Sequence, residues 1–106
     1  MPTSHEIYDI ADRQKDEGKL DEAVATLQGL VAGDPGFALA HSALAVMLGR
    51  LKRHDEAIQH ALKVCELQPN DTFSYTALSV TYVRAGKIQE AEDAKAKAQM
   101  LSGHRH

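Results

Sequence analysis

Apolar residues recur along this chain at spacings of three, four and seven positions, with polar residues between them. This spacing places apolar side chains on one face of a helix, and the strict alternation typical of a strand is absent. Proline and glycine interrupt the pattern at matching places, at Pro35 and Pro69 and again at Gly18 and Gly86. Short turns make neighbouring helices antiparallel. We therefore predict six antiparallel helices near residues 4–17, 20–33, 38–51, 54–67, 72–85 and 88–101.

The whole pattern repeats three times. Ala23, Ala57 and Ala91 stand 34 residues apart, and a glutamate precedes each of them. A period of this length is typical of stacked supersecondary units rather than of one core built around a pocket. We predict an all-α fold in a single domain, residues 1–106, with repeats at 4–37, 38–71 and 72–105.

Composition and charge narrow the classes of partner. Hydrophobic residues make up 43% of the chain and charged residues 25%, the formal net charge is −3, and both signs are spread along it. Nucleic-acid binding would call for a basic stripe, and a membrane span needs about 18 apolar residues in a row. We expect no nucleic-acid partner and no membrane insertion. The N-terminus lacks the pattern of a secretory signal, and a single cysteine cannot form an internal disulfide, which favours the cytoplasm.

Candidate catalytic and metal-binding residues are few. His54 and His60 lie six positions apart in one predicted helix and so do not share a face, while His104 and His106 have no carboxylate or thiolate nearby. We therefore predict no metal and no cofactor. We expect Cys65 to be a small buried residue rather than a nucleophile. Since no phosphate-binding loop or nucleophile elbow is present either, we predict that the chain is not an enzyme.

The repeated columns resemble the tetratricopeptide repeat, a helix–turn–helix family with a period of 34 residues. Small residues stand where that family crosses its paired helices closely: Ala11, Ala45 and Ser79 in the first helices, and Ala23, Ala57 and Ala91 in the second. The resemblance implies an α-solenoid of three helix–turn–helix repeats in a right-handed superhelical stack. It also implies a protein–protein interaction module that acts as a scaffold.

Two positions depart from the family pattern. The mid-repeat glycine is Lys52 in the second repeat, which would cost about 1 kcal/mol if the turn needs a left-handed backbone. The family's large aromatic position holds Ile7, His41 and Tyr75 in the three repeats. We expect His41 to be a partly buried packing residue.

The third repeat differs from the other two in the column that faces a following repeat. Val24 and Ile58 are replaced there by Glu92. A repeat with a successor needs an apolar face, whereas a terminal repeat needs a polar one. We therefore expect the helix near 88–101 to cap the array, and the chain to be a complete three-repeat protein.

In the family, the first helices of the pairs line a concave groove that receives peptides. An acidic end leads into an apolar trough at the matching positions of this chain. These positions are Tyr8, Asp9, Asp12, Asp16, Leu39, Ser42, Ala43, Val46, Gly49, Arg50, Phe73, Thr76, Ala77, Val80, Val83 and Arg84. The resemblance implies a peptide or helix ligand with apolar anchors. A basic residue of that ligand could meet the aspartates.

Other interpretations of the trough remain open. Its apolar side chains could pack neighbouring first helices together and expose little, or could be buried against a second copy in a homo-oligomeric scaffold. One subclass of the family holds the C-terminal carboxylate of a chaperone with a clamp of lysine, asparagine and arginine. We exclude that function, because none of the matching residues can serve and Asp12 would repel a carboxylate. These residues are Tyr8, Asp12, Ala43, Phe73 and Ala77.

Overall fold

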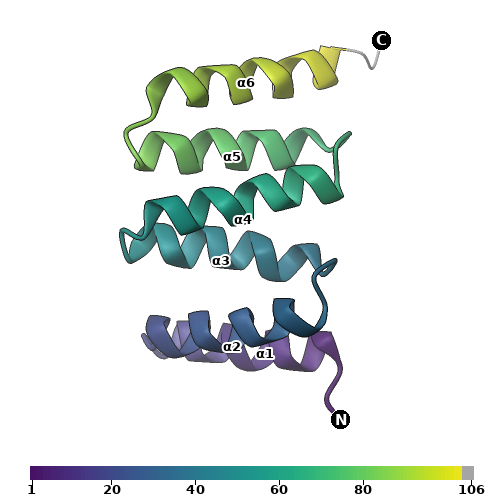
Figure 1. Ribbon diagram of the computed structural model, residues 1–106, viewed down its shortest axis with the longest axis vertical. Helices are drawn as coiled ribbons and strands as arrows, with labels where there is room; N and C mark the ends of the chain where they lie inside the picture. Colours follow the sequence, from purple (N-terminus) through teal and green to yellow (C-terminus); the bar gives the residue numbers. More distant parts are fainter. Residues whose placement is uncertain (104–106) are drawn as a thin grey trace.

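The computed structural model describes residues 1–103, and it folds this span into six α-helices without a strand (Figure 1). The predicted all-α fold is confirmed, and every predicted helix is present with boundaries that differ by two residues at most. His104, His106 and the end of the third predicted repeat lie outside the described residues. The helices are α1 (Ser4–Asp16), α2 (Leu20–Gly33), α3 (Ala38–Arg50), α4 (His54–Leu67), α5 (Thr72–Arg84) and α6 (Ile88–Gly103).

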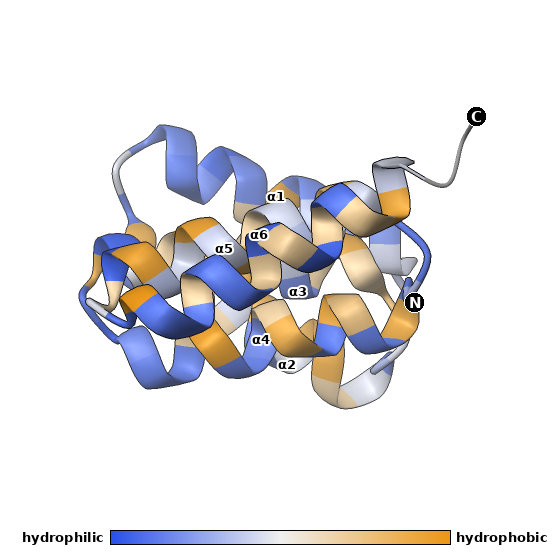
Figure 2. Cartoon of the chain, turned by 90° about the horizontal axis from the view of Figure 1, so that it is seen from above, coloured by the Kyte–Doolittle hydropathy of each residue, from blue (hydrophilic) through white to orange (hydrophobic). Residues whose placement is uncertain are grey.

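The helices stack in the order of the chain, each one antiparallel to the next (Figure 1). The closest pairs are α1–α2, α3–α4 and α5–α6, which are the three helix–turn–helix units, and α2–α3 and α4–α5 join one unit to the next. The first helices α3 and α5 also touch each other directly. The resulting solenoid measures 43 × 28 × 21 Å, and α2 and α4 lie to one side of α1, α3 and α5 (Figure 2).

Local hydrogen bonds fix where two of the first helices begin. The Thr3 hydroxyl accepts from the backbone N–H of Glu6, and the Glu6 carboxylate accepts from the N–H of Thr3. This reciprocal capping box satisfies two donors that a helix N-terminus leaves free. The Asp71 side chain likewise accepts from the N–H of Phe73 at the start of α5.

The three turns inside the repeats share one geometry, in which a residue with positive φ ends the first helix. That residue is Gly18 in the first repeat, Lys52 in the second and Gly86 in the third, with φ values of 80°, 62° and 78°. In each turn the N–H of the following residue reaches back to the helix, as in the 2.8 Å bond from Arg53 to the carbonyl of Leu48. A left-handed backbone favours glycine, so Lys52 occupies a strained position.

Replacing Lys52 with glycine is therefore expected to raise the free energy of unfolding by about 0.5–1 kcal/mol, measured by urea denaturation. The matched control is Gly86→Lys, which should lower it by a similar amount. A β-carbon added at Gly86 would meet no atom within 4 Å, so that variant reports on the backbone alone. Unchanged stability in both variants would contradict this account of the turns.

The core is built from small residues where paired helices cross and from leucines between the repeats. Ala23, Ala57 and Ala91 are all buried, as predicted, and Ser79 donates a 2.9 Å hydrogen bond to the carbonyl of Ala91. The largest fully buried side chains are all in the first two repeats: Val24, Leu27, Leu44 and Leu48. The second cluster of buried residues, between α3 and α6, is made of Ala45, Ala61, Cys65, Leu78 and Ala94. The C-terminal half therefore has a core of smaller side chains.

The outer face of α6 is polar, as the comparison of repeats predicts. Glu92 is exposed, whereas Val24 and Ile58 at the same position of α2 and α4 are buried against the next repeat. Hydrophilic residues are interleaved with apolar ones along α6 (Figure 2). Ile10, Leu44 and Leu78 stand at the same position of the three first helices, yet Ile10 is 42% exposed while Leu44 and Leu78 are buried. The reason is that α1 has a neighbouring helix on one side only, whereas α3 and α5 lie between two others.

Candidate functional site

Apolar side chains of the first helices remain open to solvent on one face of the solenoid. We call the outward surface of α1, α3 and α5 the first-helix face. Its large apolar residues expose between 43% and 81% of their surface, so contacts between neighbouring first helices leave much of each side chain uncovered. These residues are Leu39, Val46, Phe73, Val80 and Val83.

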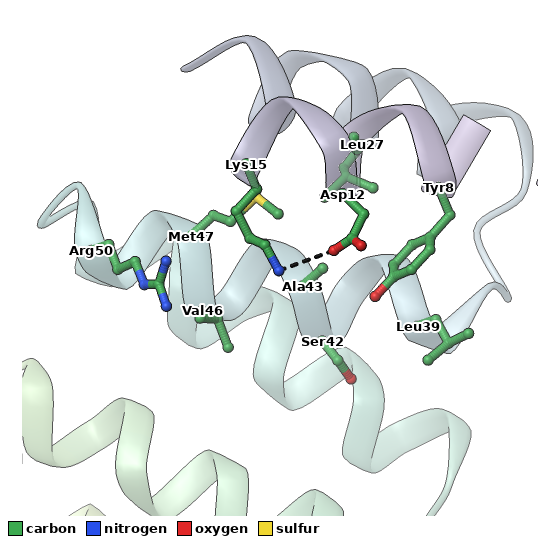
Figure 3. A pocket seen from close by; sticks show the side chains of 11 residues that line it. Tyr8, Asp12, Lys15, Leu27, Leu39, Ser42, Ala43, Val46, Met47 and Arg50 are labelled. Atoms are coloured by element: carbon green, nitrogen blue, oxygen red, sulfur yellow. Dashed lines mark ion pairs between the residues drawn. The ribbon is translucent and has the colours of Figure 1, made fainter. Parts of the chain in front are cut away.

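A first hollow of about 270 Å³ opens between α1 and α3, with Leu27 of α2 at its base (Figure 3). Side chains of α1 point across it toward α3, and we call it the α1/α3 hollow. It is lined by Tyr8, Ala11, Asp12, Lys15, Leu27, Leu39, Ser42, Ala43, Val46, Met47 and Arg50.

A second hollow of about 290 Å³ lies between α3 and α5, above the α4 residues Ala61 and Val64. We call it the α3/α5 hollow. Ser42 and Val46 line both hollows, so the two adjoin along α3. The α3/α5 hollow is lined by Ser42, Ala45, Val46, Ala61, Val64, Ser74, Ala77, Val80, Thr81 and Arg84.

The hollows bring together ten of the residues that the sequence singled out as a groove. These are Tyr8, Asp12, Leu39, Ser42, Ala43, Val46, Arg50, Ala77, Val80 and Arg84. The other six line neither hollow: Gly49, which is partly buried, and the exposed residues Asp9, Asp16, Phe73, Thr76 and Val83.

The acidic end of the face is partly neutralised by a lysine that the sequence analysis missed. Lys15 Nζ lies 3.0 Å from a carboxylate oxygen of Asp12 and 3.9 Å from one of Asp16 (Figure 3). The hydrogen bond to Asp12, together with its charge, raises the pKa of Lys15. Lysine and aspartate three positions apart on a helix are neighbours, so this pair could have been found from the sequence. Asp12 therefore already has an ion-pair partner within the protein.

A pair of histidines joins α3 to α4 inside the second repeat. His41 is buried, as expected, and its Nε2 lies 2.8 Å from the carbonyl oxygen of Pro35. Because a carbonyl can only accept, Nε2 carries the proton, and Nδ1 of a neutral His41 is an acceptor. His60 Nδ1 lies 3.0 Å from that atom and donates to it. Burial, followed by the influence of His41, lowers the pKa of His60, against a smaller opposite effect of Glu56.

The other candidate residues, Cys65 and the possible metal ligands, form no reactive or metal-binding site within residues 1–103. Cys65 is buried as predicted, its thiol donates to the carbonyl of Ser74 at 3.4 Å, and burial raises its pKa. A raised pKa disfavours the thiolate that a nucleophile needs. Within residues 1–103, histidine, cysteine and carboxylate side chains form no group of three or more that could hold a metal ion. Over the same residues, every helix is too short or too polar to cross a bilayer.

Comparison with known proteins gives a family match and one curated relative. A family model described as tetratricopeptide repeat matches residues 8–72. The human PEX5-related protein is 32% identical over 78 residues, which is 74% of this chain and 12% of that protein. The chain thus spans a small part of the length of that relative.

Solved structures with the same fold are numerous, and three illustrate the range. A crystal structure of MamA superimposes with a TM-score of 0.86 at 20% identity, over 97% of this chain and 60% of that one. The second TPR of Spaghetti (RPAP3), bound to the HSP90 peptide SRMEEVD, gives 0.80 at 18% identity, over 92% and 91%. The CopN–Scc3 complex gives 0.87 at 16% identity, over 96% and 60%. At these identities the likeness establishes the fold.

Proposed function

The chain belongs to the tetratricopeptide-repeat family, and from this premise we propose that its first-helix face binds a peptide or helical segment of another protein. The observation that carries the proposal is the pair of adjoining hollows, whose rim of half-exposed apolar side chains comes from the second and third repeats. A similar solenoid, the second TPR of Spaghetti (RPAP3), holds an HSP90 peptide, and CopN forms a complex with Scc3. Both support protein binding as the role of this fold.

The ligand that fits these hollows has apolar anchors at regular spacing. Leu39 and Val46 lie about two helical turns apart on α3, and Val80 repeats the position of Val46 on α5. Apolar ligand side chains seated against them would bury surface that now meets water. A basic ligand residue would pair with Asp9 more readily than with Asp12, which Lys15 already neutralises.

We further propose that this protein has no catalytic role and acts in the cytoplasm.

The experiment that tests the proposal blocks both hollows at once. We expect Val46→Glu to weaken binding of a peptide selected on the wild-type protein at least about tenfold. The reason is that the variant removes an apolar contact shared by both hollows and places a charged side chain beneath an apolar anchor of the ligand. Peptides would be selected from a phage-displayed random library, synthesised with a fluorophore, and titrated by fluorescence anisotropy.

The control for this test is Leu62→Glu, which places the same charge on an exposed apolar residue of α4 outside both hollows. We expect it to bind like the wild type. Thermal unfolding followed by circular dichroism checks that both variants stay folded. Equal affinity of the wild type and Val46→Glu would rule out the first-helix face as the binding site.

A second candidate is a homo-oligomeric scaffold that covers the same apolar side chains with another copy of the chain. It is favoured by Phe73 and Val83, which are more than half exposed and lie outside both hollows. Light scattering over a concentration series separates the two functions. A mass that rises with concentration in the wild type but not in Val46→Glu would support the oligomer, and a constant monomer mass would exclude it.

A further inference from the structure

Two helices of the first-helix face, α3 and α5, each carry a single formal charge, and both charges are positive. Arg50 is the sole lysine, arginine, aspartate or glutamate of α3, and Arg84 is the sole one of α5. Both stand in the last turn of their helix, one repeat apart. Arg50 lines the α1/α3 hollow and Arg84 lines the α3/α5 hollow. The apolar part of the face therefore ends in two guanidinium groups.

The side chain of Arg84 reaches across from α5 onto α3. A β-carbon built on Gly49 would lie 3.6 Å from Nη1 of Arg84 and 3.7 Å from its Cδ, which are ordinary contact distances, so the arginine lies beside this glycine. Gly49 directly precedes Arg50 in α3. The side chain of one arginine thus lies next to the residue that precedes the other.

Neither guanidinium has an acidic partner among residues 1–103, whereas Lys15, Arg53 and Lys63 all do. A positive charge in the last turn of a helix is favoured by the helix dipole, which accounts for the places of Arg50 and Arg84 in the sequence. The dipole does not account for the course of Arg84, whose side chain extends from α5 to α3. Two positive charges without a counter-ion at the same end of the neighbouring helices α3 and α5 suit an anionic ligand.

We propose that the first-helix face binds an acidic amphipathic peptide, in which apolar residues fill the hollows and an Asp or Glu side chain is held by Arg50 and Arg84. Guanidinium groups bind carboxylates through two parallel hydrogen bonds, which gives direction as well as affinity. The acidic residue would fix the orientation of the peptide along α3 and α5. The inference rests on the proposed function and adds the chemistry of its ligand. The two arginines stand elsewhere on the face than the residues that match the family's chaperone-tail clamp, among them Ala43 and Ala77.

The test uses a phage-displayed library of random dodecapeptides, selected in parallel on the wild type, on Val46→Glu and on the double variant Arg50→Gln/Arg84→Gln. Arg13→Gln is the charge-matched control, because Arg13 is exposed on α1 and lines neither hollow. We expect peptides from the wild type and the control to be enriched in Asp or Glu at a constant distance from apolar residues. The double variant should keep the apolar preference and lose the acidic one.

A synthetic peptide with the selected sequence and its Glu→Gln counterpart then measure the effect. For the wild type we expect the Gln peptide to bind about tenfold more weakly. The double variant should bind both peptides equally, which closes a double-mutant cycle between the carboxylate and the arginines. Apolar peptides that depend on Val46 but show no acidic preference would overturn this inference and leave the proposed function intact. Absence of any peptide that depends on Val46 would overturn both.

Discussion

Replacing Leu44 with alanine is expected to lower the free energy of unfolding by about 3–5 kcal/mol, which is a large share of the stability of a small domain. Leu44 is fully buried in α3, where it belongs to the core cluster that joins α1, α2, α3 and α4. The cost combines the lost burial of the side chain with the cavity that the substitution leaves. The cavity remains because two helix pairs pack together there and cannot close around it. Urea denaturation followed by circular dichroism measures the change.

The matched control removes the same atoms from a residue that does not hold the repeats together. Leu62 is 40% exposed on α4 and belongs to neither core cluster. Leu62→Ala should therefore cost less than about 1 kcal/mol. Equal losses in the two variants would mean that the repeats are not held together by the core described above.

Replacing His41 with alanine is the second change with a large expected effect, a loss of roughly 2–3 kcal/mol at pH 8. The variant leaves the Pro35 carbonyl and Nδ1 of His60 without their partner, and it opens a cavity between α3 and α4. His5→Ala, at an exposed position of α1, is the control and should cost little. A loss no larger than that of the control would show that the pair contributes nothing to stability.

The pH dependence of stability tests the same histidine pair in the wild type. The folded pKa of His60 lies below its ordinary value of 6.5, so between these two values the unfolded chain binds more protons than the folded one. Stability is therefore full above pH 6.5 and falls as the pH drops below it. A protonated His60 would hold its charge in a partly buried site beside His41, and the nearby Glu56 does not offset this cost. We expect the slope between pH 8 and 5.5 to be smaller in His41→Ala.

Most of the fold was predictable because its determinants are local. The helices are long stretches of apolar periodicity, and their ends carry chemistry that works within a few residues, as in the capping box of Thr3 and the turns at Gly18 and Gly86. The 34-residue period then added information on tertiary packing, because residues at matching positions of stacked repeats have similar surroundings. That comparison predicted the strained backbone of Lys52 and the polar face around Glu92.

The site was less predictable because it depends on long side chains that cross between helices. Matching of repeat positions placed Arg84 on the first-helix face, yet it could not show that the side chain lies beside Gly49 of the neighbouring repeat. The histidine pair was missed for a similar reason. A polar residue in a buried column needs a hydrogen-bond partner, so His41 signalled that one existed. Its identity as His60, 19 residues away, depends on how α3 and α4 pack against each other.

The uneven core has a consequence for the order in which the chain folds. Because each helix packs mainly against the next, contacts join residues close in sequence, and folding requires no long loop to close. The largest fully buried side chains belong to α2 and α3, so we expect the transition state to form around these helices and to leave α5 and α6 to add later. During synthesis, α2 and α3 leave the ribosome before α5 and α6 do. The last pair then docks onto a surface that is already formed.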